Sequence, residues 1–382
     1  TAYQTGGFNG VSDYALKNRE RITEDSVIVI ALAGKQMKNE TVIKIDISIA
    51  DALKYKTCSA WCNFYLAQYC ENSNRDSDAL EISDKILLVF IETNDLKGEA
   101  YTYDLRGMIF KRNKNYSKAK ESYLKVLDLS QKLHNDYLTG WSYKQLGEIE
   151  YETGNNESAF KMYFNALKHF AKDEQNNFMQ GSTYYSLGMI LLEDNDFSKA
   201  IEMFSNSLAF YKSAESNFGQ AAALIALGEI YSFMNNYQKS IEMYSGALAV
   251  REKEPDNGDL GYINLSLGKI YLDIGEIQKA KELFAKALVF SVLAKNKSAI
   301  AQLYVYLGDS YSLTGNKLDA LKMYAKSLPY IKESLARYHI ADLLFRVGEQ
   351  MNFYGSHKDA IETYSQALPI YESIHDLAGQ GK

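Results

Sequence analysis

The chain has 382 residues, a formal net charge of −6 at pH 7 and three cysteines. An acidic balance argues against nucleic acid and anionic membrane surfaces as partners, because both attract basic proteins. No apolar run reaches the ~18 residues that a membrane-spanning helix needs, and the polar residues 1–22 do not read as a signal peptide. We therefore expect a cytoplasmic protein.

The first 55 residues carry the least regular pattern. Residues 1–22 hold three glycines and no sustained hydrophobic period, which predicts a loose N-terminal lead-in. Within residues 23–55 the segment TVIKIDISIA alternates apolar and polar residues, as a strand of a β-hairpin would. Helices over 25–37 and 40–55 would instead continue the pattern of the chain that follows. We favour the helices and predict a divergent N-terminal helix pair over 23–56.

From residue 57 onward the chain repeats one sequence pattern. A degenerate unit over 57–92 has Ala67 where the later units have glycine. Those glycines lie 40 residues apart, with a single step of 41: Gly107, Gly147, Gly188, Gly228, Gly268, Gly308 and Gly348. A small residue follows each glycine after twelve positions and an aromatic residue after sixteen. A fixed period of this length predicts stacked helix pairs.

Each unit then consists of two helices. First helices are expected near 99–112, 138–153, 179–194, 219–234, 259–274, 299–314 and 339–354. Second helices are expected near 116–133, 156–172, 197–213, 237–252, 277–293, 317–333 and 357–374. The last residues, 375–382, match the connector that precedes other units, which predicts that a solenoid over 57–382 stops where a further unit of a longer protein begins.

The conserved spacing of small residues has a packing reason. A glycine inside a helix costs about 1 kcal/mol relative to alanine, so glycines at one register indicate a close approach of the two paired helices. The aromatic residue is expected to fill the space between one pair and the next. On the helical interpretation of the N-terminal segment, Ala33, Ile45, Ile49 and Ala52 occupy the corresponding positions.

This pattern resembles the tetratricopeptide repeat over roughly residues 57–375, as in LGKIYLDIGEIQKAKELFAKAL at 267–288. The 40-residue period is similar to that of repeats in bacterial signalling and regulatory proteins, whereas the basic repeat of the family has about 34 residues. The resemblance implies an all-α fold, a right-handed superhelical solenoid of antiparallel helix pairs with about 8–9 units.

The sequence lacks three common motifs of enzymes. It contains no glycine-rich phosphate loop, no HExxH and no GxSxG, so we predict no catalytic, cofactor or metal site and no enzyme. Cys58, Cys62 and Cys70 fall on one helix, at spacings that suit small buried residues better than a disulfide or a CxxC metal pair. The histidines lack a cysteine or carboxylate partner at the spacing of a site and are interpreted as solvated: His134, His169, His339, His357 and His375.

A binding surface is the remaining candidate. In the resembled family the first helices line a concave groove, and positions near the glycine face into it. The resemblance implies these partner-binding residues: Lys144, Glu148, Tyr151, Tyr185, Met189, Glu229, Phe233, Lys269, Asp273, Asp309 and Glu349. Their mixed apolar and acidic character suits an extended or helical peptide with apolar anchors and some Lys or Arg. The alternative is that they are ordinary solvated helix faces.

The sequence thus predicts a non-catalytic protein- or peptide-binding scaffold or sensing module, part of a larger bacterial signalling or regulatory protein. Two alternatives stay open. The chain is either the regulatory domain of a kinase, cyclase or protease whose catalytic domain lies outside it, or a self-association module that forms a homo-oligomer. The expected partner is a protein or a basic peptide with apolar anchors, not nucleic acid or membrane.

Overall fold

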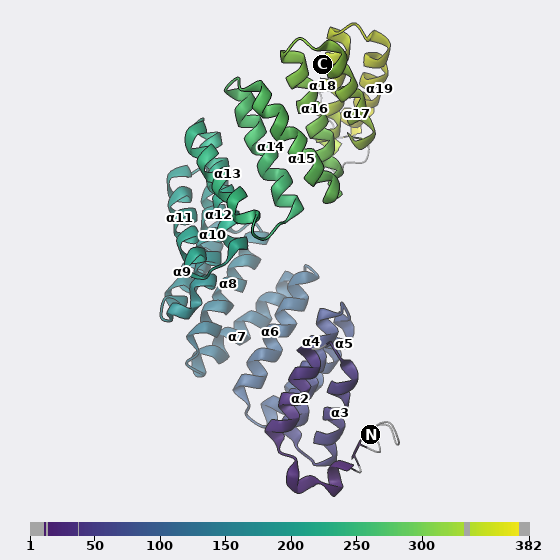
Figure 1. The fold of residues 1–382 in the computed structure, drawn as a ribbon. Coiled ribbons are helices and arrows are strands. Elements are labelled where there is room, and N and C mark those ends of the chain that lie inside the picture. The colour runs from purple at the N-terminus through teal and green to yellow at the C-terminus, as the bar shows by residue number, and fades with distance from the viewer. Residues whose placement is uncertain (1–10, 13, 37, 332–336, 374–382) are drawn as a thin grey trace. The chain divides into compact units, whose positions relative to one another are not determined.

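The computed structural model describes residues 11–12, 14–36, 38–331 and 337–373, which form helices joined by short turns and contain no strand (Figure 1). Half of the predicted lead-in, residues 1–10 and 13, lies outside these residues, as does the predicted start of a further unit at 375–382. The chain forms two compact units, unit 1 over Thr1–Ile190 and unit 2 over Leu191–Lys382.

Unit 1 is a succession of helices, each in contact with the next over α2 to α9. Its helices are α2 (Glu24–Gln36), α3 (Glu40–Ala52), α4 (Lys56–Asn72), α5 (Asp76–Glu92), α6 (Leu96–Arg112), α7 (Tyr116–Lys132), α8 (Asp136–Glu152) and α9 (Asn156–Phe170). Two short 3-10 helices are η1 (Arg19–Arg21) and η2 (Glu174–Asn176), and α10 (Asn177–Glu193) contains the division between the units.

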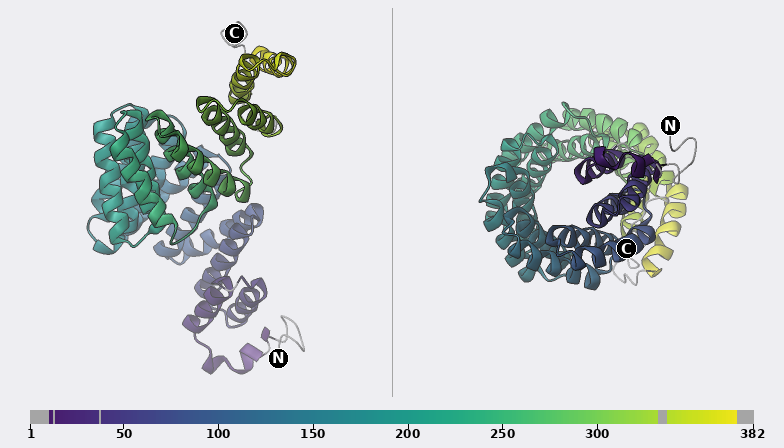
Figure 2. Two further views of the ribbon diagram at one scale, coloured as in Figure 1. Left: turned by 45° about the horizontal axis from the view of Figure 1, so that its top comes forward. Right: turned by 90° about the horizontal axis from the view of Figure 1, so that it is seen from below.

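Unit 2 repeats the same arrangement, and consecutive helices again lie side by side (Figure 2). Its helices are α11 (Phe197–Ser213), α12 (Asn217–Phe233), α13 (Tyr237–Arg251), α14 (Asn257–Asp273), α15 (Ile277–Leu293), α16 (Lys297–Leu313), α17 (Lys317–Ile331), α18 (Arg337–Phe353) and α19 (His357–Ser373). Within unit 1 the helices from α2 to α9 form four successive pairs, and within unit 2 those from α12 to α19 form four more, so the predicted all-α solenoid of antiparallel helix pairs is confirmed.

First helices start two or three residues earlier than predicted, because capping residues precede the apolar pattern. The side chains of Ser216, Asp256 and Asn296 each accept a hydrogen bond from a backbone N–H in the first turn of the helix that follows. The turns inside the pairs are short because a residue in the left-handed region ends the first helix, as Gly275 does at φ +84°.

The recurring glycine makes room for an aromatic ring of its own helix pair. A Cβ atom added to Gly308 would lie 2.4 Å from a ring carbon of Tyr324, and one added to Gly268 would lie 2.6 Å from Phe284. The small residue twelve positions on meets the glycine backbone, as where the Ser240 hydroxyl donates to the Gly228 carbonyl at 2.7 Å. The predicted close approach is therefore present, with a ring filling part of it.

The N-terminal segment also forms a helix pair, α2 and α3, where the sequence left a β-hairpin open. The predicted register is wrong, because Ala33, Ile45, Ile49 and Ala52 are only half-buried. The buried residues are Val27, Ala31 and Gly34 in α2, and Ile43, Asp46 and Ala50 in α3. These two helices have 13 residues each, against 17 in α4, so the spacing taken from the longer helices is misplaced.

Alanine at Gly308 tests the contact between glycine and ring. The new methyl group would collide with Tyr324, so we expect Gly308→Ala to lower the free energy of unfolding by about 1–3 kcal/mol, although alanine itself favours helix by about 1 kcal/mol. Urea denaturation followed by circular dichroism measures the change. Gly246→Ala in α13 is the matched control, since the nearest atom lies 3.5 Å away, and it should match or exceed wild type. If the two variants unfold with equal free energies, the contact between Gly308 and Tyr324 does not exclude a methyl group as we infer.

Candidate partner-binding site

Four of the predicted residues line one hollow in unit 2. This unit 2 hollow has a volume of about 620 Å³, and its walls come mainly from α12 and α14. Glu229 and Phe233 contribute from α12, and Lys269 and Asp273 from α14. These positions lie one and five residues after successive repeat glycines, so the repeat itself places them next to each other.

The rim of the unit 2 hollow carries an open aromatic pair. The rings of Phe197 and Phe233 lie 6.1 Å apart between centroids, at an interplanar angle of 36°. Phe233 is 79% exposed, although it belongs to the last turn of a well-packed helix. Exposed large apolar side chains are common when scattered singly. Here the second ring and the adjoining hollow make an apolar surface that a ligand can cover.

The unit 2 hollow is also lined by polar side chains, two of which are bonded to each other. The Tyr262 hydroxyl donates to the Glu229 carboxylate. Burial, and next the Glu229 carboxylate, raise the pKa of Tyr262, and burial raises the pKa of Tyr244 to about 12. Both phenols therefore keep their protons at neutral pH and act as donors. Glu229 thus accepts a hydrogen bond from a neutral phenol, which orients the carboxylate and leaves its negative charge in place.

A second hollow lies in unit 1 and holds two more predicted residues, Lys144 and Glu148. This unit 1 hollow has a volume of about 700 Å³, with apolar walls that include Met108 and Trp141. The Trp141 indole N–H donates to Asp104 at 2.8 Å. Glu148 lies between the ammonium groups of Lys144 and Lys111 and bonds to both. Lys144 is buried, which the sequence did not indicate.

Electrostatics within the unit 1 hollow are dominated by this lysine–glutamate–lysine cluster. Burial alone would raise the pKa of Glu148, but Lys144 and Lys111 outweigh it, and the pKa lies below its usual value. The carboxylate is therefore ionised at neutral pH and holds two cations together. A ligand that enters this hollow meets a compensated cluster and not an open negative charge.

The remaining predicted residues line neither hollow. Tyr151, Tyr185 and Met189 are half-buried, and Glu349 is exposed. Asp309 binds the Arg346 guanidinium and accepts from the Tyr324 hydroxyl at 2.9 Å. The carboxylates of Glu148 and Asp309 are thus paired with cations within the protein, whereas the partner of Glu229 is a neutral hydroxyl, so the acidic character expected of the groove is compensated at two of these three positions.

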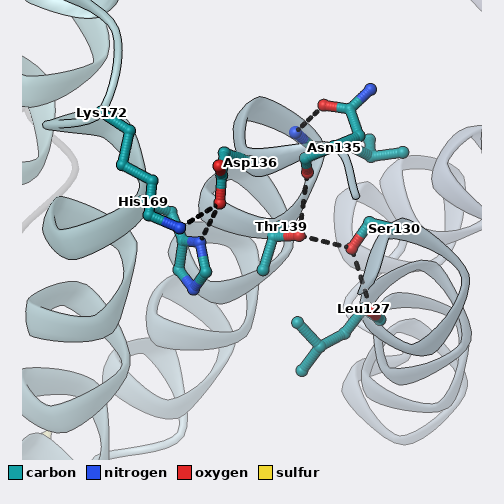
Figure 3. A network of polar contacts seen from close by, with 8 residues as sticks. Leu127, Ser130, Asn135, Asp136, Thr139, His169 and Lys172 are labelled. Atoms are coloured by element: carbon teal, nitrogen blue, oxygen red, sulfur yellow. Dashed lines mark hydrogen bonds and ion pairs between the residues drawn. The ribbon is translucent and has the colours of Figure 1, made fainter. Parts of the chain in front are cut away.

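The structure also brings together a polar network that sequence reasoning missed. His169 Nδ1 lies 2.8 Å from Asp136 Oδ1, and Lys172 Nζ lies 2.6 Å from the same oxygen (Figure 3). His169 is half-buried and bonded to Asp136, so its interpretation as a solvated histidine is wrong. Asp136 precedes His169 by 33 residues. No local motif signals this pairing, since it depends on how the end of α9 meets the start of α8.

The hydroxyl groups drawn in this network do not complete a catalytic arrangement. Ser130 and Thr139 hydrogen-bond to each other at 2.9 Å, and Thr139 also donates to the Asn135 carbonyl (Figure 3). His169 stacks on Tyr143 with the ring centroids 5.8 Å apart. The network therefore joins the ends of α7, α8 and α9, which is a structural role.

Within the described part of the chain, no group of three His, Cys, Asp or Glu side chains is placed to hold a metal ion. No helix in that part is long and apolar enough to cross a bilayer. Cys58, Cys62 and Cys70 are buried and free, as predicted.

Known proteins resemble the chain in sequence pattern and in fold. The tetratricopeptide repeat model matches residues 219–288, and the soluble NSF attachment protein (SNAP) model matches residues 84–253. The chain thus carries tetratricopeptide-type repeats, and the family model itself covers residues 219–288. No curated protein matches this repeat protein in sequence.

Three solved structures share the fold of the repeat protein. The apo form of RapI has 17% identity and a TM-score of 0.56, over 72% of this chain and 99% of its own. Aspartyl phosphate phosphatase F from Bacillus subtilis has 15% identity and a TM-score of 0.56, over 94% and 96%. A signal transduction ATPase (STAND) protein with a tetratricopeptide repeat sensor from Pyrococcus horikoshii has 17% identity and a TM-score of 0.62, over 88% and 54%.

Removal of the charge on Glu148 tests the cluster in the unit 1 hollow. Glu148→Gln leaves Lys111 and Lys144 without their shared carboxylate, so we expect the free energy of unfolding to fall by about 1.5–3 kcal/mol at pH 7. Because the folded pKa of Glu148 is lowered, its stabilisation is present above the unfolded pKa of about 4.3 and is lost as the pH falls through the folded pKa. The difference from wild type should therefore narrow in acid.

Urea denaturation at pH 7 and at acidic pH measures this difference. Glu157→Gln is the control, since the Glu157–Lys161 pair is solvated, with side chains 87% and 67% exposed. It should change stability by less than about 0.5 kcal/mol at either pH. If wild type and Glu148→Gln differ by the same free energy of unfolding at both pH values, the ionised Glu148 carboxylate is not the source of the stabilisation.

Proposed function

We propose that the repeat protein is a non-catalytic protein- or peptide-binding module that holds a segment of its partner in the unit 2 hollow. The observation that carries the proposal is the exposed Phe233 ring, which packs against the half-buried Phe197 at a hollow that is also lined by polar side chains. Aromatic residues at the centre of a desolvated contact dominate many interfaces. An aromatic side chain buries on the order of 150–250 Å² at about 25 cal/mol per Å², so covering Phe233 stabilises a complex substantially.

The chemistry of the hollow defines the ligand that we propose. Phe197 and Phe233 suit an aliphatic or aromatic anchor, and Ser266 and Asn235 at the wall suit hydrogen bonds with a peptide backbone. Asp273 is exposed, whereas Glu229 is bonded to Tyr262. A basic residue of the partner would therefore be recognised by Asp273, and apolar anchoring is the larger contribution.

We also propose that this binding serves sensing within a larger cytoplasmic signalling or regulatory protein. The STAND protein supports this setting, because it shares the fold and carries a tetratricopeptide repeat sensor. The chain matches 54% of the length of that protein. The three buried free cysteines suit a reducing compartment. The regulatory-domain hypothesis is the same module attached to a catalytic domain, so the binding test below applies to both.

Selection from a displayed library of random twelve-residue peptides against the whole chain tests the proposal. We expect enriched peptides to carry a large apolar residue, and Phe233→Ala to weaken the best of them by ten- to a hundred-fold, equivalent to about 1.4–2.8 kcal/mol. Fluorescence polarisation measures the dissociation constant. Phe353→Ala is the matched control, because Phe353 occupies the same repeat position, is 77% exposed and lies outside the hollow. It should bind within twofold of wild type.

Other outcomes would redirect the assignment. Failure to enrich any peptide, or equal loss in both variants, would contradict the unit 2 hollow as the binding site. Sedimentation that depends on chain concentration in wild type and not in Phe233→Ala would show that a second copy covers the aromatic pair, which is the self-association hypothesis.

A further inference from the structure

Asp46 is a carboxyl group within the apolar core of the N-terminal helix pair. It lies on α3 in the buried stripe that also contains Ile43 and Ala50, and only 1% of it is exposed. Its Oδ2 atom has no hydrogen-bond partner in the described part of the chain. An ionised carboxylate that is buried without a partner costs far more free energy than a neutral carboxyl group. The packed helix pair therefore favours the protonated form of Asp46.

Among the residues that the structure describes, the side chains around Asp46 supply no compensating positive charge. On α4, the thiols of Cys58 and Cys62 face it, and both are fully buried. Cys58 and Cys62 share a hydrogen bond, and Cys58 also donates to the Glu24 carbonyl at 3.6 Å. The ionisable groups that act on these thiols from α2 and α3 are all acids: Glu24, Asp25 and Asp51.

The lysines on the adjacent elements either bind groups other than Asp46 or are exposed to solvent. Lys44 on α3 pairs with Glu40 at 2.7 Å, and Lys35 on α2 donates to Gln68 at 2.6 Å. Lys17, in the segment before η1, is exposed. Burial consequently raises the pKa of Asp46 to about 7. The usual value for an aspartate is about 3.9.

We propose that the N-terminal helix pair is a pH-sensitive element, which packs on α4 while Asp46 is protonated and is released from α4 as Asp46 ionises. The direction of the pH effect follows from the linkage between proton binding by Asp46 and packing of the helix pair. A raised folded pKa means that the stabilisation is full below the unfolded pKa and is lost as the pH rises through the folded pKa. Between pH about 4 and about 7, the equilibrium constant for packing should fall about tenfold per pH unit, and it should level off above that range.

Release would expose the face of α4 that α2 and α3 now cover. That face includes Cys58 and Cys62, which belong to the same buried cluster as Val27 and Ala31 of α2. The first helix pair therefore opens or closes a surface at the N-terminal end of unit 1 without unfolding the pairs that follow. The device is independent of the unit 2 hollow.

Hydrogen exchange of the whole chain, followed by mass spectrometry at pH 5.5, 6.5, 7.5 and 8.5, tests this inference after correction for intrinsic exchange rates. We expect protection of residues 24–52 to fall at least tenfold between pH 5.5 and 7.5, while protection of α14 stays constant. Asp46→Asn should remove this pH dependence, because the amide does not ionise. Asp25→Asn removes an exposed carboxyl group from α2 and should keep the wild-type dependence.

Flat protection of residues 24–52 in wild type would overturn the proposal, and so would an Asp46→Asn variant with the wild-type slope. If Asp46→Asn loses protection at every pH, Asp46→Ala decides instead, since it buries no polar group. Constant protection in Asp46→Ala would support Asp46 as the titrating group, and a wild-type slope would assign the dependence to another residue.

Discussion

The contact between a glycine of one helix and an aromatic ring of its partner is the constraint on which the regular repeats depend. Where Tyr324 covers Gly308, the ring occupies the volume that a Cβ atom would need. The two helices can therefore pack closely with a large side chain between them. The glycine lowers the helix propensity of its own helix, and the buried ring offsets that cost by removing apolar surface from water.

This inward packing determines which side chains remain at the surface to bind a partner. Once the glycine and its neighbours face the paired helix, positions such as those of Glu229 and Phe233 point away from the core. Several charged groups at these positions are nevertheless bonded within the protein, as Glu148 is to Lys144 and Asp309 is to Arg346. Net charge is therefore a poor guide to the surface that a partner meets, and exposed aromatic area is a better one.

The repeat architecture could be predicted from sequence because one glycine recurs at a fixed period with an aromatic residue after it, as at Gly268 and Phe284. The positions of Glu229, Phe233, Lys269 and Asp273 followed from the same period, and the structure places them around one hollow. Which carboxylates are compensated could not be predicted, because the bond between Glu148 and Lys111 joins different repeats. The N-terminal register was missed because α2 and α3 are shorter and lack the glycine–ring pair.

The equal length of the first helices has an evolutionary consequence. Because α12, α14, α16 and α18 each have 17 residues, the fifth residue after the glycine recurs at the same place in every pair, as Phe233, Asp273, Leu313 and Phe353. Exchanges at this exposed position leave the buried glycine–ring contact untouched. A lineage can therefore acquire new partners by point substitution or by duplication of a pair, while selection for folding acts on a separate set of residues.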